Sequence, residues 1–267
     1  MSLSPVPAPP PPRPIDDDEE ESDVGGKMSF LEHLDELRQR LIKALLAVLV
    51  GFLIAIAFIN PIFDFVMAPL QAILPAGGKL IYTEPTEAFM LYMKMAALVG
   101  LMIALPVVLW QVWAFIAPGL YAHEKRFAIP FVMMSTIFFI GGALFSHYVV
   151  FPAMWRFFAS FSTETVEFAP RIEPVFSLYV RMALWLGAVF EMPTLVMFLA
   201  RVGLVTPMLL IRNTKYAILI IFVVAAVVTP SPDVVSQFLL ALPMFVLYAF
   251  SIFVAWVFQK RTSPASA

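Results

Sequence analysis

The sequence predicts an all-α integral membrane protein with six transmembrane helices and both termini on the cytoplasmic side. The first observation is composition: 61% of the 267 residues are hydrophobic, 13% are charged, and the mean hydropathy is +0.88. Soluble domains are about half apolar and about a quarter charged. The other two observations are six apolar stretches of membrane length and an uneven distribution of Lys and Arg between the connections.

Residues 1–27 differ from the rest of the chain. The proline-dense stretch MSLSPVPAPPPPRP is followed by the acidic block DDDEEESD, and both lack the apolar surface that offsets the entropy of ordering. The basic start and unbroken apolar run of a signal peptide are missing. We expect a disordered Pro-rich, acidic cytoplasmic tail over 1–27, a membrane domain over 28–261 and a second disordered tail over 262–267.

Most of the six apolar stretches contain or border a proline, which bends a helix. Bent helices favour a curved wall with a concave side over a tight parallel bundle. The fifth stretch would reach only about 20 Å as a helix, against about 30 Å of hydrocarbon. A helix of this length must thin the bilayer locally, recruit flanking polar residues or pack beside other helices. The alternative is a longer helix that Asn213 and Thr214 extend at its start. The predicted spans are 41–59, 88–112, 127–151, 176–202, 216–228 and 238–258, and the prolines are Pro106, Pro130, Pro152, Pro193 and Pro243.

The distribution of Lys and Arg orients these spans. Twelve of the 17 residues lie in the termini and in the connections 113–126 and 201–215, and the other five lie on the opposite side. Cytoplasmic connections carry the excess of Lys and Arg in membrane proteins. Both termini are therefore predicted to be cytoplasmic.

Glu191 is the strongest single candidate for a functional residue. It lies near the middle of the fourth predicted span, directly before Met192-Pro193. A carboxylate in hydrocarbon is costly unless it faces a cavity, finds a partner or binds a proton. We favour a site open to a water-filled recess or a polar partner; the alternative is a protonated Glu191 that caps the backbone carbonyl freed by Pro193. Arg181 lies about 15 Å away along the axis, and we expect it to snorkel to the outer interface.

A second candidate site lies on the cytoplasmic side. Leucines recur at helical spacing in MSFLEHLDELRQRLIKALL, which predicts an amphipathic helix that runs into the first span. Glu36 in this segment and Glu124 in FIAPGLYAHEKR, where Pro118-Gly119 sets a stiff turn, would lie on the same face. Two carboxylates above an apolar rim suit two arginines followed by an apolar stretch. The alternative pairs Glu36 with Arg40 and Glu124 with its neighbouring cations.

The stretch TPSPDVVSQ (229–237) joins the last two predicted spans on the outer side. Its prolines stiffen the connection, and Asp233 is placed to cap the N-terminus of the sixth helix, which is the structural interpretation of this residue. Gln237 follows one turn later and faces the same side as Asp233.

Motifs of soluble enzymes are absent from the sequence, including H-E-x-x-H, G-x-S-x-G, the P-loop and G-x-G-x-x-G. We therefore expect no enzyme activity, no cofactor and no metal, and we interpret His33, His123 and His147 as packing or interfacial residues. One alternative is a proton- or ion-coupled transporter of small solutes with Glu191 as the coupling carboxylate, but no inverted repeat is visible. A second alternative, an intramembrane hydrolase, lacks a cysteine, a metal motif and a Ser/His pair at membrane depth.

Five segments carry a resemblance to a known family. They are HLDELRQRLIKAL (33–45), APL (68–70), QVWAFIAPGLYAHEKR (111–126), FEMP (190–193) and TPSPDVVSQ (229–237). In this order and spacing they closely resemble the TatC family, the multispanning core subunits of the twin-arginine (Sec-independent) protein translocase. The resemblance covers about residues 28–261. It implies a glove-like, concave fold with short fifth and sixth helices, located in a bacterial-type cytoplasmic (inner) membrane.

The resemblance also implies roles for particular residues. Glu36 and Glu124 match the acidic site for the paired arginines of a signal peptide, and Glu191 matches the polar residue of the concave groove. Residues that match the surroundings of the acidic site are Arg38, Gln111, Phe115, Pro118, Tyr121 and Arg126, and matches in the outer connections are Pro69, Asp233 and Gln237. Arg181 departs from the family pattern, because it places a cation within a span.

The implied partners follow from the same resemblance. The protein would bind twin-arginine signal peptides of folded precursor proteins at the cytoplasmic face and nucleate the export complex. Single-span subunits of the TatA/TatB type would dock near the short fifth and sixth helices, and several copies of the chain would assemble in the receptor complex. Transport would be driven by the proton motive force, and no nucleic acid is involved.

Overall fold

The computed structural model describes residues 18–74, 80–116, 128–163, 165, 168–229 and 233–259. Regular secondary structure in these ranges is helical, apart from one isolated parallel bridge between Ile81 and Arg171. In chain order the elements are α1 (Asp18–Ala57), α2 (Ile59–Gln71), α3 (Pro85–Ile116), α4 (Ala128–Phe145), the π-helical segment η3 (Ser146–Val150), α5 (Phe151–Ala159), α6 (Ile172–Phe190), α7 (Met192–Val202), α8 (Pro207–Arg212), α9 (Thr214–Val228) and α10 (Val234–Phe258).

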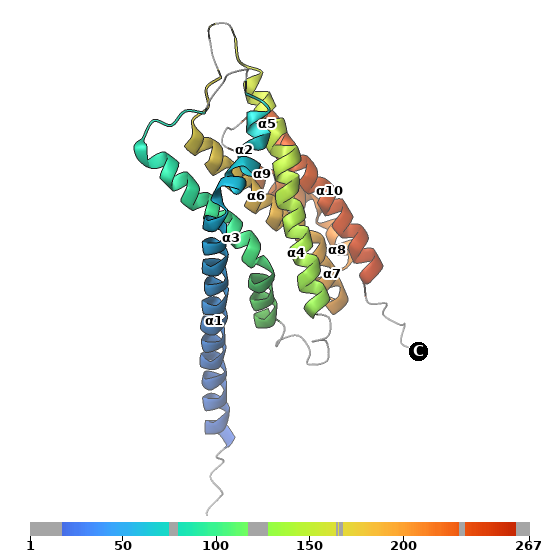
Figure 1. Cartoon of the computed structure of the whole chain (residues 1–267). Coiled ribbons are helices and arrows are strands. Elements are labelled where there is room, and N and C mark those ends of the chain that lie inside the picture. Colours follow the sequence, from blue (N-terminus) through green and yellow to red (C-terminus); the bar gives the residue numbers. More distant parts are fainter. Residues whose placement is uncertain are drawn as a thin grey trace, which may run out of the picture.

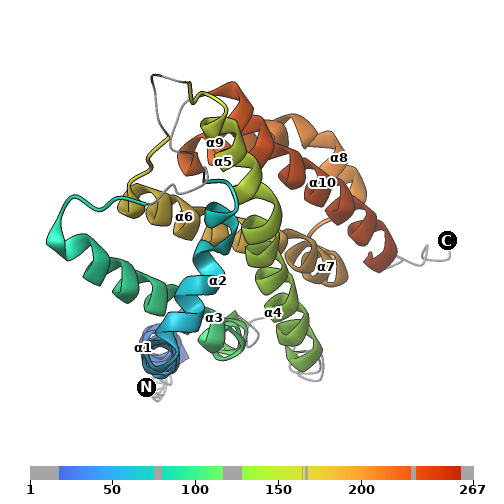
Figure 2. The same ribbon diagram turned by 45° about the horizontal axis from the view of Figure 1, so that its top comes forward.

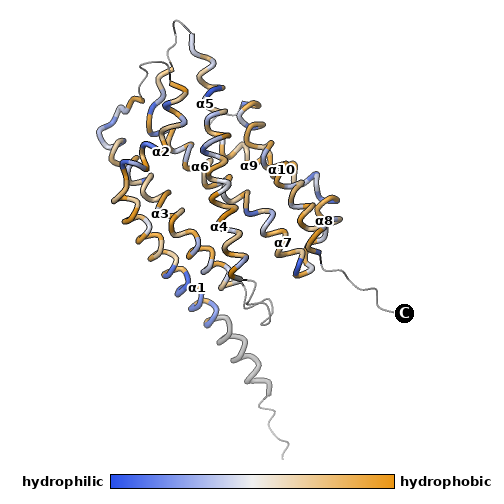
Figure 3. The backbone as a smooth tube through the Cα atoms, turned by 45° about the vertical axis from the view of Figure 1, so that its right-hand side comes forward, coloured by the Kyte–Doolittle hydropathy of each residue, from blue (hydrophilic) through white to orange (hydrophobic). Residues whose placement is uncertain are grey.

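The described helices confirm an all-α protein with several membrane spans. Within the described part of the chain, five stretches are long and apolar enough to cross a membrane: α1, α3, α4 to α5, α6 to α7, and α10. Figure 3 shows hydrophobic residues along these helices and hydrophilic residues near the start of the coloured part of α1. The fifth predicted stretch forms α9, a shorter apolar helix. The count of six crossings and the cytoplasmic termini stay predictions.

Two elements differ from the expected boundaries. Helix α1 begins at Asp18, inside the segment expected to be a tail. Helix α2 occupies the connection between the first two predicted spans, and Pro69 lies inside this helix rather than in a loop. The α2 helix buries Val66, Met67 and Leu70, a spacing that places the three side chains on one face.

Prolines interrupt two of the long helical stretches. Pro193 lacks the N–H that would continue α6, so the helix ends at Phe190 and α7 begins at Met192, with Glu191 as the junction. In the preceding stretch, Pro152 follows η3, where the helix widens locally. Helix α7 ends at Val202 and is followed by Gly203, whose φ of 85° is the left-handed conformation that glycine adopts without strain. The expected bends at Pro152 and Pro193 therefore coincide with breaks in helical geometry.

The helices have two distinguishable ends in Figure 1. The lower end carries the start of α1, the end of α3, the start of α4 and the ends of α7 and α10. The upper end carries α2, α5 and the start of α6. Figure 2 shows α1 and α3 together at one side of the molecule and α8 and α10 at the other, with α4 between them. Sites at the lower and upper ends are therefore well separated.

The main core is formed by side chains from α2, α3, α5, α6, α9 and α10. Its largest fully buried members include Phe151, Phe176, Met182 and Leu240. Helix α1 lies outside this core and crosses α3 closely, because a Cβ atom at Gly51 would be only 2.3 Å from the backbone oxygen of Gly100. Small residues permit such approaches between membrane helices. The Gly51/Gly100 crossing thus fixes α1 against α3.

Candidate functional site

His33, in the first half of α1, contacts Phe115 near the end of α3 at the lower end of the molecule. Their rings stack with centroids 4.4 Å apart and planes inclined by 12°. Phe115 belongs to the predicted site, whereas His33 was expected only to pack. The contact places the amphipathic segment of α1 beside the last turn of α3.

Glu36 lies one helical turn after His33, on the face of α1 that meets α3. Its Oε1 atom accepts hydrogen bonds from Arg40, from Nε at 2.9 Å and from the second terminal nitrogen. Its Oε2 atom lies 3.7 Å from His33 Nδ1, and the Glu36 side chain is 31% exposed. The alternative pairing of Glu36 with Arg40 is therefore present in this structure. The carboxylate nevertheless remains accessible from outside.

The end of α3 is anchored on its other side by an aromatic cluster that sequence reasoning missed. Trp113 is 7% exposed and packs edge-on against Phe131 of α4, with ring centroids 3.8 Å apart. It also packs edge-on against Phe198 of α7 at 4.6 Å. Because Trp113 and Phe115 lie on different sides of α3, the helix end is held between α1, α4 and α7. The described helices that flank residues 117–127 are thereby packed against their neighbours.

The other predicted residues of this site divide into two groups. Arg38 is exposed on α1, and Gln111 is partly exposed on α3, four residues before Phe115 and hence on the same face of the helix. Pro118, Tyr121, Glu124 and Arg126 lie outside the described residues. The structure therefore brings together Glu36 and Phe115 through His33.

Glu191 is buried at the junction of α6 and α7. It is 9% exposed, and its Oε1 atom has no hydrogen-bond partner among the described residues. The hydroxyl group of Ser135 on α4 interacts with the carboxyl group. Thr194, one turn later and 1% exposed, also leaves its hydroxyl without a partner in the described part of the chain. A polar cluster of Ser135, Glu191 and Thr194 is thus buried between α4 and the α6/α7 junction.

A close helix crossing positions this polar cluster. A Cβ atom added at Gly142 of α4 would lie 2.6 Å from the backbone oxygen of Leu186 and 2.9 Å from the Cα atom of Gly187. The two glycines let α4 approach α6 closely, just before the α6/α7 junction. Ser135 on α4 therefore comes within reach of Glu191.

The residues of the last predicted connection have structural contacts. Asp233 Oδ1 accepts a hydrogen bond from Ser236 N at 2.7 Å, which is the predicted N-cap of α10. Gln237 Nε2 donates to the backbone oxygen of Phe222 at 3.0 Å and so joins α10 to α9. A third contact joins α10 to α8, where Tyr248 donates to the Leu210 carbonyl oxygen at 2.7 Å.

Two ion pairs at the upper end were not anticipated from the sequence. Glu87 is 6% exposed and accepts a hydrogen bond from Arg171 at 2.5 Å and one from Thr83 N at 3.2 Å. Lys94 Nζ donates to Glu173 Oε1 at 2.9 Å. The partners are 84 and 79 positions apart in the chain, so no local sequence pattern predicts these two pairs. Together they join the start of α3 to the start of α6.

Comparisons with known proteins agree with this architecture. A family model described as "Sec-independent protein translocase protein (TatC)" matches residues 32–243. Two relatives named Sec-independent protein translocase protein TatC come from Desulforapulum autotrophicum (45% identity over 235 residues, 88% of this chain and 87% of the relative) and Koribacter versatilis (43% over 239 residues, 88% and 87%).

A solved structure, the twin-arginine translocase receptor TatC in DDM, superposes with a TM-score of 0.76 at 36% identity, covering 84% of this chain and 99% of that chain. A second crystal structure of the same receptor gives a TM-score of 0.74 and the same identity. Several apolar helices and these similarities establish a multi-pass membrane protein. The chain belongs to the TatC family of Sec-independent, twin-arginine protein translocase proteins.

Proposed function

We propose that this TatC-family protein is the signal-peptide receptor of a twin-arginine translocase. It binds the paired arginines of a folded precursor protein between Glu36 on α1 and the connection that follows α3. The observation that carries this proposal is the stacked contact of His33 with Phe115, which places the Glu36 carboxylate beside the end of α3. Glu124, in the connection after α3, supplies the second carboxylate.

The pairing of Glu36 with Arg40 is compatible with such a receptor. An ion pair between partly exposed side chains at i and i+4 contributes only about 0.3–0.5 kcal/mol. A hydrogen bond to a charged group contributes about 1.5–3 kcal/mol when it is well aligned and shielded from water. An incoming guanidinium that forms two such bonds therefore displaces Arg40 at a small cost. Before the substrate arrives, Arg40 keeps the carboxylate oriented.

The site is also preorganised for binding. The aromatic cluster of Trp113, Phe131 and Phe198 fixes the end of α3 against α4 and α7. Packing of the two flanking helices before binding reduces the entropy lost on association. This arrangement explains why a carboxylate that must meet two arginines follows a Pro-Gly turn and a run of aromatic residues.

The remaining parts of the proposal follow from the family. The membrane domain spans 28–261 between two tails, crosses the bacterial inner membrane six times and has both termini in the cytoplasm, so the lower end faces the cytoplasm. Single-span subunits of the TatA/TatB type dock near α9 and α10, several copies assemble, and the proton motive force drives transport. The protein acts in translocation rather than as an enzyme. The family assignment favours the translocase over the solute transporter.

Binding of a synthetic signal peptide to the full chain in nanodiscs tests the proposal. An Arg-Arg peptide is expected to bind more tightly than the matched Lys-Lys peptide, because an ammonium group cannot form the bidentate contact. Glu36→Gln combined with Glu124→Gln should remove this preference. Asp35→Asn is the matched control, since Asp35 is an exposed acid next to Glu36 on another face of α1. Equal affinity for both peptides would contradict arginine recognition.

A further inference from the structure

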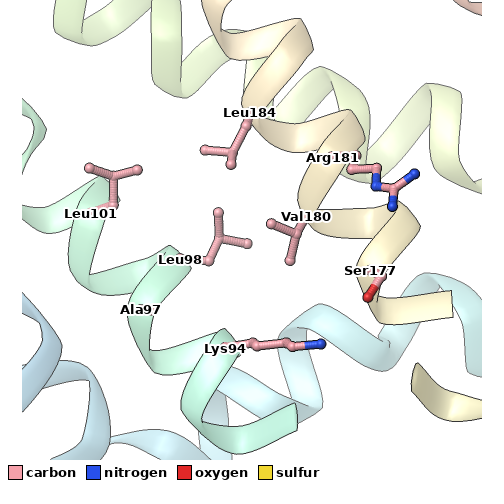
Figure 4. A pocket seen from close by; sticks show the side chains of 8 residues that line it. All are labelled: Lys94, Ala97, Leu98, Leu101, Ser177, Val180, Arg181 and Leu184. Atoms are coloured by element: carbon pink, nitrogen blue, oxygen red, sulfur yellow. The ribbon is translucent and has the colours of Figure 1, made fainter. Parts of the chain in front are cut away.

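An open groove with a volume of about 420 Å³ lies between α3 and α6, toward the upper end. This volume falls in the range of ligand-binding sites. Figure 4 shows Leu98, Leu101, Val180 and Leu184 directed into the space between the two helices. Lys94 and Arg181 lie at the edge of the groove. The groove therefore combines an apolar lining with cations at its edge.

The two cations differ in how their charge is compensated. Lys94 pairs with Glu173, which also accepts a hydrogen bond from Ser177 at 2.8 Å. Arg181 is exposed and has no ion-pair or hydrogen-bond partner among the described residues. It shares one face of α6 with Glu173 and Ser177, because the three positions are spaced by four residues. The groove thus carries one uncompensated positive charge.

The position of Arg181 determines the kind of anion that could compensate it. Arg181 lies about 13 Å along the helix axis from the start of α6, within a stretch of membrane-spanning length. An uncompensated guanidinium at this depth is costly unless it reaches an anion or the interface. A molecule that offers both an anion and an apolar chain satisfies Arg181 and the leucine-lined groove together.

We propose that the α3/α6 groove binds an anionic phospholipid, whose phosphate contacts Arg181 and whose acyl chain lies along Leu98 and Leu184. The planar guanidinium is matched to two phosphate oxygens. Because the groove has a single net positive charge, an anionic headgroup fits better than a zwitterionic one, which brings a cation of its own. Basic sites between membrane helices bind anionic lipid headgroups by the same chemistry. The inference does not depend on signal-peptide binding at the opposite end.

Native mass spectrometry of the full chain tests this site. The protein is released from mixed micelles that contain equal amounts of phosphatidylglycerol and phosphatidylcholine, and retained lipids are counted. Wild type should retain phosphatidylglycerol preferentially, and Arg181→Gln should lower that preference about fivefold, the effect of one cation near an anionic headgroup. Arg181→Lys keeps the charge and should retain part of the preference. Arg156→Gln removes an equal charge from α5, outside the groove, and should change nothing.

Four outcomes would overturn the inference. The first is an unchanged preference in Arg181→Gln, and the second is an equal loss in Arg156→Gln, which would indicate a general effect of net charge. The third is displacement of the lipid by millimolar inorganic phosphate, which would indicate that Arg181 binds a free anion. The fourth is a wild-type protein with no preference between the two lipids, which would indicate that a carboxylate of a partner helix occupies the groove instead. Arg181→Gln is expected to fold, because it removes no hydrogen bond or ion pair among the described residues and keeps most of the aliphatic side chain.

Discussion

The close crossing of α1 and α3 should be required both for stability and for the geometry of the proposed receptor site. At Gly51 an added Cβ atom would lie 2.3 Å from the Gly100 carbonyl oxygen, a distance that real side chains essentially never show. At Gly141 of α4 an added Cβ atom meets nothing within 4 Å. Ala at either position gains about 1 kcal/mol of helix propensity relative to Gly. The difference in stability between Gly51→Ala and Gly141→Ala therefore measures the cost of the steric contact between α1 and α3.

The magnitude of the steric term follows from the geometry. Relief of the contact at Gly51 requires the helices to separate by about 1 Å, and forced overpacking of this kind costs about 1–3 kcal/mol. Gly51→Ala should be less stable than Gly141→Ala by that amount. The separation should also loosen the stack of His33 on Phe115 and lower affinity for the Arg-Arg peptide, while Gly141→Ala keeps wild-type affinity.

Unfolding in mixed detergent and SDS micelles, followed by circular dichroism, measures the stability difference. Peptide titration in nanodiscs measures the second effect. Equal stability of the two variants would contradict the close approach of α1 to α3 at Gly51. A destabilised Gly51→Ala variant with unchanged peptide affinity would show that the crossing of α1 and α3 does not control peptide binding at the receptor site.

Three further predictions concern other parts of the molecule. Glu191→Gln should impair transport in vesicles while Arg-Arg peptide docking stays at wild-type affinity, and loss of docking would mean that Glu191 belongs to the receptor site. Asp233→Ala should lower the free energy of unfolding by about 1 kcal/mol through loss of the α10 cap, and Asp233→Ser should restore most of it. Arg171→Gln leaves the Glu87 carboxylate without its cation and should lower the free energy of unfolding. Adding Glu87→Gln to that variant should recover part of the loss, and a purely additive loss would exclude the ion pair as the cause.

Local patterns in the sequence predict much of this fold. The helices at α3, α9 and α10 follow from runs of apolar residues, the Asp233 cap follows from a side chain that accepts from the backbone three residues later, and Pro193 marks the α6/α7 junction. Pairing of Glu36 with Arg40 was one of two interpretations that the spacing allowed, and the helical geometry of α1 realises it. Each of these features depends on residues within one or two turns.

Other features depend on residues that meet only after folding. Glu87 finds Arg171, and Trp113 finds Phe198, across long separations in the chain. Sequence periodicity contains no information on such pairs. The leucine-rich start of α1 suggested an interfacial helix, yet the ring of His33 became apparent as a site residue only through its contact with Phe115. Helix α2 was missed because its buried face is short and adjoins two prolines.

A thermodynamic cycle tests whether Glu36 contacts the arginines of the signal peptide. Wild type and Glu36→Gln are each titrated with the Arg-Arg and Lys-Lys peptides, in nanodiscs and at fixed salt. A direct contact predicts a coupling free energy above about 0.5 kcal/mol, since residues in contact couple by about 0.5–3 kcal/mol. Effects that add to within about 0.3–0.5 kcal/mol would show that Glu36 does not touch the arginines and would contradict the proposed receptor site.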